Sequence, residues 1–244
     1  MLKYLSPSFI LLILISCSNE TNYQDERSSN LIKPNFTSIQ IRYDCKLNKD
    51  KSLNNLEALI PSLVTQIQAA SPSANIEFLF NQANNIERFS ILYSDNEMNA
   101  DGESFTGLII DQGISKISSC NSTDKKMLSA NIYIDNNPLN LTSFEVEILN
   151  CEFNPGFNYG TFSIEIDTFL NLLRKKDIQY FAKFQQVDSE SSSFTWINYL
   201  GSEDDRNNLY KSWLGQEDSI AIQDAFNTHS ICQSSASYKG YKVL

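Results

Sequence analysis

The sequence predicts an α+β protein built from two tandem units with the same order of elements. Three observations support this prediction: an internal repeat, apolar-striped helices that alternate with short apolar strands, and cysteines at matching places in the two halves. Apolar residues that recur every three to four positions predict a helix, whereas short runs rich in β-branched and aromatic residues predict strands. With 244 residues, 41% of them hydrophobic, the chain is long enough for one large domain or two small ones.

The repeat is clearest around two cysteines, Cys45 and Cys151. Residues 43–48 read Tyr-Asp-Cys-Lys-Leu-Asn, and residues 149–154 read Leu-Asn-Cys-Glu-Phe-Asn. After each of these cysteines the chain passes through similar elements in the same order until it reaches a second cysteine. Self-similarity over about a hundred residues indicates two copies of one structural unit.

In the first half, a strand through Cys45 is followed by a helix, two strands, an acidic loop, Cys120 and a last strand. The predicted helix carries an apolar stripe made of Leu56, Leu59, Ile60, Leu63, Val64 and Ile67. The later strands are expected at residues 76–80, 89–93 and 130–134.

In the second half, a strand through Cys151 precedes a helix with apolar residues at i, i+3, i+4 and i+7, namely Ile166, Phe169, Leu170 and Leu173. The segments expected to follow are strands at 180–187 and 194–200, an acidic loop at 203–205, a helix at 219–227, Cys232 and a last strand at 238–243. Each half therefore has the split βαβ order of a ferredoxin-like domain.

The strand phases differ between the two halves. Five alternate residues share one face of the first strand: Ile39, Ile41, Tyr43, Cys45 and Leu47. In its counterpart, Phe144, Val146 and Ile148 are out of phase with Cys151. A β-bulge would account for this difference, and so would a strand buried on both faces. The second alternative leaves one face of each sheet free to pack on the other unit.

Residues 14–17, Leu-Ile-Ser-Cys, end an apolar run and resemble the lipobox of bacterial lipoproteins. Lys3 provides the positive start of a signal peptide, and Ser16 is the small residue required before the cleavage site. An ordinary secretory signal or a membrane span are the alternatives, but the apolar run 9–15 is much shorter than a span of about 18 to 20 residues. We expect Cys17 to be lipidated.

The lipobox predicts the organisation and location of the whole chain. We expect a signal peptide at 1–16, a flexible tether at 17–35, a first ferredoxin-like unit at 36–138 and a second at 139–244. The tether is rich in Ser, Asn, Thr and acidic residues, which offer little apolar surface to bury. Ser18 after the cysteine favours the outer membrane, facing the periplasm or the cell surface, with the lipid as the membrane anchor.

Four cysteines remain once Cys17 is assigned to lipid, and an exported chain favours disulfides. Spacing alone allows three pairings. In a ferredoxin-like unit the first and last strands are close in the sheet, so the repeat selects Cys45 with Cys120 and Cys151 with Cys232. Free thiols or a metal site are the alternatives, but cysteines two to four residues apart, as zinc sites use, are absent.

From element order, repeat and paired cysteines, residues 36–244 resemble the dimeric α+β barrel superfamily, with the two units fused in one chain. The Cys-x-x-Asn segments at 45–48 and 151–154 also look like those of a group of bacterial lipoproteins. The superfamily resemblance implies a cavity between two sheets. The superfamily includes cofactor-independent monooxygenases, haem enzymes and stress-response binding proteins, so the fold alone does not determine a function.

Several kinds of chemistry have no support in the sequence. A formal charge of -10 disfavours nucleic acid as a partner. His229 is the only histidine, which excludes centres with several histidines. No nucleophile elbow or phosphate-binding loop occurs. Residues 97–102 resemble the start of a calcium loop, but Leu108 stands where a carboxylate is required. We therefore predict no catalytic residues, no metal and no cofactor.

Two functions follow from the anchor, the repeat and the missing catalytic groups. The leading prediction is a non-enzymatic module that binds a small apolar ligand or an envelope partner, with Trp196, Tyr199 and His229 as ligand contacts and Trp213 as a further cavity residue. The alternative is a cofactor-independent monooxygenase-like barrel enzyme, in which Trp196, Tyr199 and His229 would contact substrate or move protons.

Overall fold

The structure is a computed structural model, and it describes residues 32–81, 87–95, 107, 113–122, 126–134, 142–214 and 216–244. Lys33–Leu244 form one compact unit. The predicted lipidation site Cys17 and the calcium-like loop 97–102 lie outside the described residues. The elements are β1 (Ser38–Leu47), α1 (Leu53–Ala70), β2 (Asn75–Asn81), β3 (Arg88–Asp95), α3 (Ser115–Ile117), β4 (Ser118–Ser122), β5 (Met127–Tyr133), β6 (Ser143–Phe153), α4 (Tyr159–Lys175), β7 (Phe181–Gln186), β8 (Ser193–Leu200), α5 (Glu203–Trp213), α6 (Glu217–His229) and β9 (Ser230–Lys242).

Each half of the compact unit has the strand order of a ferredoxin-like domain. In the first half the order is β4-β1-β3-β2, and in the second it is β9-β6-β8-β7. All the pairings are antiparallel. The predicted α+β fold class is therefore confirmed.

The two halves close into one barrel by exchanging strand edges. The end of β9 pairs with β2 of the first half, and β5 pairs with β7 of the second half. Among the described strands, eight form the closed ring β3-β2-β9-β6-β8-β7-β5-β1, since β1 also pairs with β3. β4 adds to the free edge of β1 beside β5. Closure removes the exposed edges that separate sheets would leave.

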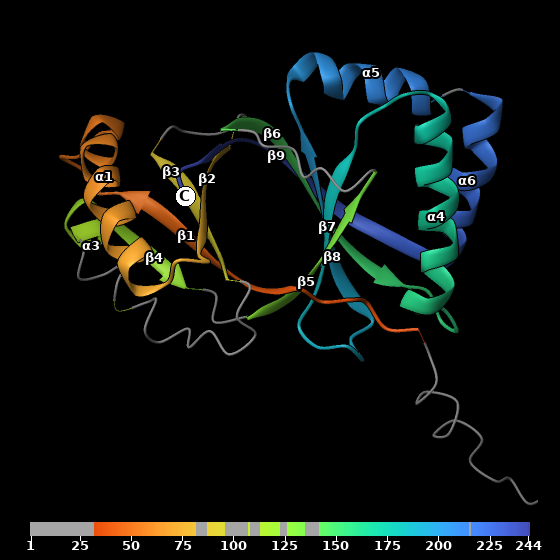
Figure 1. Cartoon of the computed structure of the whole chain (residues 1–244), viewed down its shortest axis with the longest axis horizontal. Helices are drawn as coiled ribbons and strands as arrows, with labels where there is room; N and C mark the ends of the chain where they lie inside the picture. Colours follow the sequence, from red (N-terminus) through yellow and green to blue (C-terminus); the bar gives the residue numbers. More distant parts are fainter. Residues whose placement is uncertain are drawn as a thin grey trace, which may run out of the picture. The chain divides into compact units, whose positions relative to one another are not determined.

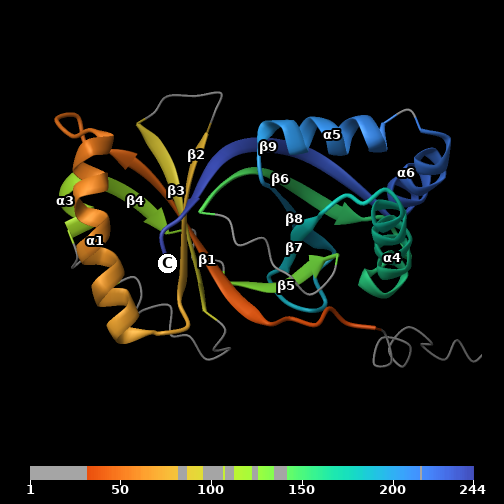
Figure 2. The same ribbon diagram turned by 45° about the horizontal axis from the view of Figure 1, so that its top comes forward.

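The helices lie outside the barrel, at its two opposite sides. α1 and α3 lie over the first half, whereas α4, α5 and α6 lie over the second half (Figure 1). The turned view shows the same arrangement, with β9 running from the α6 side across to β2 (Figure 2). Among the described helices, none has both the length and the apolar character needed to cross a membrane.

Local sequence signals set where the helices of the second half begin. Asn158 Oδ1 accepts a hydrogen bond from the backbone N–H of Thr161 at 3.2 Å and so caps α4. Ser202 caps α5 by accepting from the backbone N–H of Asp205 at 3.1 Å. The acidic segment 203–205, which the sequence placed in a loop, forms the first turn of α5, where the positive end of the helix dipole favours carboxylates.

Three apolar cores divide the interior. One lies between α1 and the sheet of the first half, and a second lies between α4, α5, α6 and the sheet of the second half. The third fills part of the barrel itself and consists of Leu79, Leu92, Phe144, Val146, Ile148, Ile197, Tyr199 and Tyr238. Burying both faces of the same strands is what makes the barrel a rigid support for side chains on either face.

The phase difference between the two first strands now has a physical reason. Phe144 and Ile148 of β6 face the barrel core, whereas Cys151 and Phe153 belong to the core under the helices. β6 is therefore buried on both faces, the second of the two sequence-based alternatives. A register shift also occurs opposite β6, because Asn150 pairs with Ser234 while Cys151 pairs with Cys232, which skips one residue of β9.

Both predicted disulfides are present. Cys45 and Cys120 are directly opposite each other on β1 and β4, with their Cα atoms 4.0 Å apart. Cys151 and Cys232 are opposite on β6 and β9, at 3.9 Å. The sequence placed Cys232 just before the last strand, but it lies inside β9, since that strand begins at Ser230. Cys120 likewise lies inside a strand, β4, which precedes the strand expected last in the first half, so the disulfides join β1 to β4 and β6 to β9. Each disulfide closes a long chain loop.

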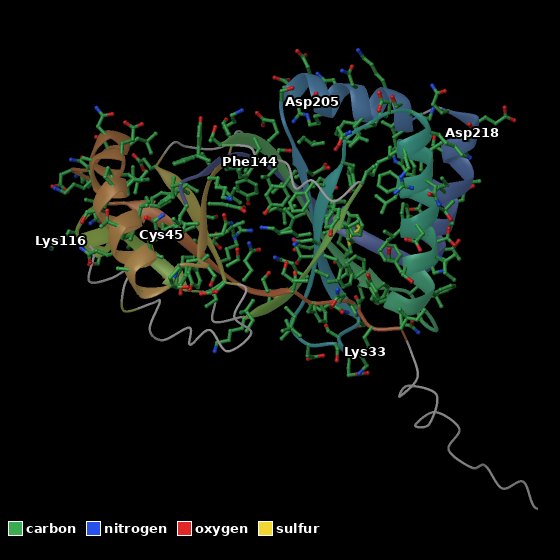
Figure 3. The ribbon with its side chains drawn as sticks, viewed as in Figure 1. Lys33, Cys45, Lys116, Phe144, Asp205 and Asp218 are labelled. Carbon is green, nitrogen blue, oxygen red and sulfur yellow. A yellow bond between two sulfur atoms is a disulfide. The ribbon has the colours of Figure 1, made fainter. Side chains whose placement is uncertain are left out.

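Gly240 of β9 provides a test of packing inside the barrel. A Cβ atom added to Gly240 would lie 2.2 Å from Cε2 of Phe144, whose ring covers this glycine. Figure 3 shows Phe144 within the barrel region. We expect Gly240→Ala to lower the free energy of unfolding by about 1 to 3 kcal/mol, as overpacking does. Thermal and urea unfolding would measure this change.

In Phe144→Leu, the leucine side chain lacks the aromatic ring and leaves room for a methyl group at position 240. The double variant Phe144→Leu with Gly240→Ala is therefore expected to lose less stability than the sum of the two single variants. Additive losses would contradict the proposed contact between these two positions.

Candidate functional site

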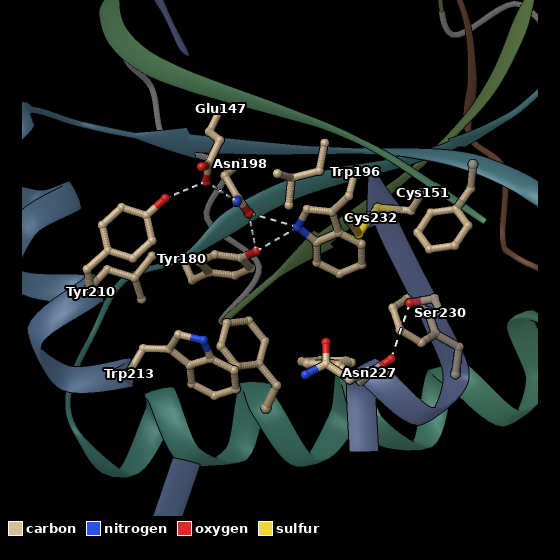
Figure 4. Close-up of a pocket in the computed structure, with 16 residues that line it drawn as sticks. Glu147, Cys151, Tyr180, Trp196, Asn198, Tyr210, Trp213, Asn227, Ser230 and Cys232 are labelled. Atoms are coloured by element: carbon tan, nitrogen blue, oxygen red, sulfur yellow. Dashed lines mark hydrogen bonds between the residues drawn. A yellow bond between two sulfur atoms is a disulfide. The ribbon is translucent and has the colours of Figure 1, made fainter. Parts of the chain in front are cut away.

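A cavity of about 350 Å³ lies between the sheet of the second half and its helices. Its lining is mainly aromatic, and it comes from strands on one side and from α4, α5 and α6 on the other (Figure 4). The lining residues are Glu147, Leu149, Cys151, Phe162, Phe169, Tyr180, Phe194, Trp196, Asn198, Leu209, Tyr210, Trp213, Phe226, Asn227, Ser230 and Cys232. We refer to this space as the aromatic cavity.

Strand alternation places the sheet side of the aromatic cavity. Phe194, Trp196 and Asn198 are two residues apart on β8, so they project from the same face. Glu147 lies directly opposite Asn198 on β6. The opposite wall is apolar, since Phe169 packs edge-on against Trp213, with ring centroids 4.9 Å apart. The cavity thus combines planar apolar walls with a few polar groups, which is the usual composition of a small-molecule site.

The polar groups of the aromatic cavity form one hydrogen-bonded chain. Nε1 of Trp196 donates to Oδ1 of Asn198 at 2.8 Å, and the hydroxyl of Tyr180 donates to the same oxygen. Nδ2 of Asn198 then donates to Oε2 of Glu147 at 3.1 Å, and the hydroxyl of Tyr210 donates to that Oε2 at 2.6 Å (Figure 4). Both bonds to Glu147 reach the same oxygen, so Oε1 keeps its capacity to accept a proton or a hydrogen bond.

Burial controls the ionisation of the two tyrosines. Loss of hydration raises the pKa of Tyr180 far above its usual range, and the nearby charge of Glu147 adds to this effect. Burial also raises the pKa of Tyr210, whose hydroxyl donates to Glu147. Both phenols are therefore neutral hydrogen-bond donors at physiological pH.

The three ligand contacts expected from the sequence lie in three different places. Trp196 lines the aromatic cavity, together with Trp213. Tyr199 is on the other face of β8, inside the barrel, because it is an odd number of residues from Trp196. His229 ends α6, where its Nδ1 is 2.8 Å from the carbonyl of Ala225 and its ring packs on Phe157.

Sequence reasoning missed most of the polar side chains at this site. Tyr180, Tyr210 and Glu147 do not form a motif in the sequence and meet only through the fold. Asn198 could have been predicted from the sequence, because it is two residues from Trp196 in an apolar strand and therefore lies on the same face.

The residues at the aromatic cavity do not fit a haem or a metal ion. Haem iron takes a histidine, a thiolate, a methionine or a tyrosinate as axial ligand. The lining residues include no histidine or methionine, both cysteines are in a disulfide, and burial opposes ionisation of the tyrosines. Within the described part of the chain, no group of three or more metal-binding side chains comes together.

No protein-family profile matches the sequence, and no curated protein sequence is significantly similar to it. Solved structures do match the fold. A candidate monooxygenase from Lactobacillus acidophilus matches with a TM-score of 0.56 at 9% identity, over 84% of this chain and 95% of that one. A candidate chlorite dismutase matches with a TM-score of 0.52 at 12% identity, over 84% and 95%.

A candidate monooxygenase from Fusobacterium nucleatum matches with a TM-score of 0.51 at 11% identity, over 85% of this chain and 93% of that one. These matches are to proteins of the dimeric α+β barrel fold, as the resemblance in the sequence implied. The leading prediction, a non-enzymatic binding module, is wrong on this comparison, because the neighbours are described as enzymes. The alternative, a monooxygenase-like barrel, agrees better with them.

The buried phenols predict an alkaline limit to stability. Below pH 10, tyrosine is neutral in both the folded and the unfolded chain. Above pH 10 the unfolded chain ionises first, because the folded pKa values of Tyr180 and Tyr210 are raised, so stability is lost as the pH rises. Urea unfolding at pH 8 to 11 would measure the loss. A Tyr180→Phe/Tyr210→Phe variant with the same pH dependence would contradict this assignment.

Proposed function

We propose that this protein is a cofactor-independent oxygenase that acts on a planar, phenol-bearing aromatic substrate in the aromatic cavity. The observation that carries the proposal is the hydrogen-bonded chain of Glu147, Asn198, Tyr180 and Trp196 at the wall of an otherwise apolar space of about 350 Å³. The fold shared with candidate monooxygenases supports the same assignment.

The walls select the shape of the substrate. Phe162 packs edge-on to Trp196 and Phe169 packs edge-on to Trp213, so flat rings border the space from both sides. Aromatic rings favour stacked or edge-on contact with another ring. A ring system of two or three fused rings suits such walls, and the polar chain at one side fixes where its hydroxyl group lies.

The chain of polar groups gives each residue a role. Glu147 is the one carboxylate among the described lining residues, and it accepts the phenolic proton of the substrate through Oε1. Tyr210 holds the other oxygen of Glu147 in place. Trp196 and Tyr180 fix the amide of Asn198, which in turn orients Glu147. Tyr210 is a neutral donor that stabilises the negative charge of Glu147, whereas Tyr180 donates to the amide oxygen of Asn198.

The electrons for oxygen chemistry come from the substrate itself. Removal of the phenolic proton gives a phenolate, which transfers one electron to O₂. Superoxide and the phenoxyl radical then join at the para carbon to form a C–O bond, and the resulting peroxide takes up a proton. Cleavage of the O–O bond and loss of the para hydrogen release water and leave a para-quinone. One phenol and one O₂ thus give one quinone and one water.

Turnover by the purified protein, with both disulfides formed, tests this function directly. An oxygen electrode would record O₂ uptake with a panel of fused-ring phenols such as 1-naphthol and its dihydroxy relatives. We expect Glu147→Gln to lower turnover at least about tenfold while binding is kept, since loss of a positioned base typically costs 10²- to 10⁴-fold. Quenching of the fluorescence of Trp196 and Trp213 would report binding.

Glu152→Gln is the matched control, because Glu152 is on the same strand but exposed and outside the aromatic cavity. His229→Ala is expected to keep turnover, since His229 lines none of the described cavities. The oxygenase proposal is wrong if no phenol of the panel causes oxygen uptake, or if Glu152→Gln and Glu147→Gln lose turnover equally.

Lipid attachment at Cys17 belongs to the same proposal and places the enzyme at the outer membrane, where apolar aromatic compounds partition. Ser16, the apolar run before it and the polar segment after it support this location. Lipid chains each contribute about 0.8 kcal/mol per buried methylene, so several chains on Cys17 make the anchor permanent.

A bacterial host with two membranes allows a test of the anchor. We expect the chain to incorporate labelled palmitate and to sediment with outer membranes, and Cys17→Ser to abolish both. Cys45→Ser/Cys120→Ser is the control for general loss of cysteine, since these residues are joined in a disulfide. Palmitate in the Cys17→Ser variant would contradict the assignment.

A further inference from the structure

A second cavity, of about 370 Å³, opens at one mouth of the barrel and does not share a residue with the aromatic cavity. Tyr199 and Lys183 contribute to it from the inner faces of β8 and β7, whereas Trp196 faces the helices. The lining residues are Ser38, Ser73, Ala74, Asn75, Glu77, Ser94, Asn131, Phe144, Phe181, Lys183, Tyr199, Lys242 and Leu244. We refer to it as the barrel-mouth cavity.

The barrel-mouth cavity contains a buried ion pair. Nζ of Lys183 is 3.0 Å from Oε1 of Glu77, and the two side chains are only 9% and 6% exposed. The hydroxyl of Tyr199 donates to Oε2 of Glu77 at 2.8 Å. Nζ of Lys183 also lies 4.8 Å from the centre of the Tyr199 ring. These contacts leave the ammonium group with further N–H donors for a ligand.

Stability alone does not account for this ion pair. Replacing a buried pair by apolar residues is often neutral or stabilising, because the charges must be taken out of water. The other part of the barrel interior is filled by Leu79, Ile148, Ile197 and their neighbours, so apolar packing was available in this fold. Polar groups kept at the mouth therefore favour recognition of another molecule.

One polar atom in the same place lacks a partner. Oδ1 of Asn75 is buried, and no described residue donates a hydrogen bond to it, although its Nδ2 donates to Glu77 at 2.9 Å. A buried acceptor without a donor costs about 1 to 3 kcal/mol. A ligand hydroxyl would satisfy it.

Two lysines supply positive groups for a ligand. Lys183 and Lys242 line the barrel-mouth cavity beside one acidic side chain, Glu77, and the ammonium group of Lys183 keeps N–H donors that Glu77 does not use. Phe144 and Phe181 supply an apolar wall. We propose that the barrel-mouth cavity is a second binding site, for a small organic acid that carries a carboxylate for the lysines and a hydroxyl for Asn75. This site is independent of the proposed oxygenase site.

Calorimetry with 4-hydroxybenzoate as the probe tests the second site, because heat reports binding anywhere in the protein. The only two tryptophans, Trp196 and Trp213, both line the aromatic cavity, so fluorescence reports that cavity alone. We expect heat of binding with no change in tryptophan fluorescence. Benzoate lacks the hydroxyl and 4-hydroxybenzamide lacks the charge, and each is expected to bind at least about tenfold more weakly.

The variant to compare is Lys183→Met with Glu77→Gln, which removes both charges and keeps an acceptor for Tyr199. We expect it to melt within a few degrees of the parent, since no buried charge is left unpaired, and to bind 4-hydroxybenzoate at least tenfold more weakly. Lys211→Met, at an exposed position of α5, is the control for the loss of one positive charge and is expected to bind normally.

Two results would overturn the second site. One is the absence of any binding heat in the parent protein at millimolar probe. The other is binding that quenches tryptophan fluorescence and persists in the double variant, which would place the probe in the aromatic cavity. Oxygen uptake by the parent is scored separately, so failure of the barrel-mouth site leaves the oxygenase proposal standing, and the reverse also holds.

Discussion

The exchange of strand edges between the two halves is the constraint on which this structure depends. A ferredoxin-like sheet alone has unpaired backbone groups at its edges, and each half here supplies the partner for the other through β5–β7 and β9–β2. The closed ring fixes which face of every strand is inside the barrel. As a result, the aromatic cavity lies on the helix-covered face of β6 and β8, and the other face of these strands lines the barrel.

Much of this architecture follows from local sequence patterns. The apolar stripe of α1, the matching Cys45 and Cys151 segments and the order of elements predict both ferredoxin-like halves and their disulfides. The edge exchange is different, because it joins strands of different halves: β5 pairs with β7, for example Leu128 with Gln186, and β9 pairs with β2, for example Lys242 with Glu77. Nothing in a single strand records such a partner, so the sequence indicates two units without showing how they close.

The site was harder to predict than the fold, for a related reason. Trp196 and Tyr199 are an odd number of residues apart on one strand, so their side chains lie on opposite faces and line different cavities. Glu147 and Tyr210 come from a strand and a helix that meet only in the folded chain. His229 was predicted as a ligand contact because it is the single histidine, but it is the last residue of α6 and its ring packs on Phe157.

The residue of β9 that its pairing with β6 skips determines which side chains of this strand lie inside the barrel. Cys232 and Tyr238 are six positions apart, so an even strand would place both on one face, yet Cys232 joins the helix-side disulfide and Tyr238 lies inside the barrel. Because Gln233 is skipped in the pairing, the side chains before and after it alternate between the two faces of β9 in opposite phase. Gain or loss of a single residue between Cys232 and Tyr238 would move the side chains that now face the barrel to the helix side, whereas a change of two residues would keep each side chain on its present face.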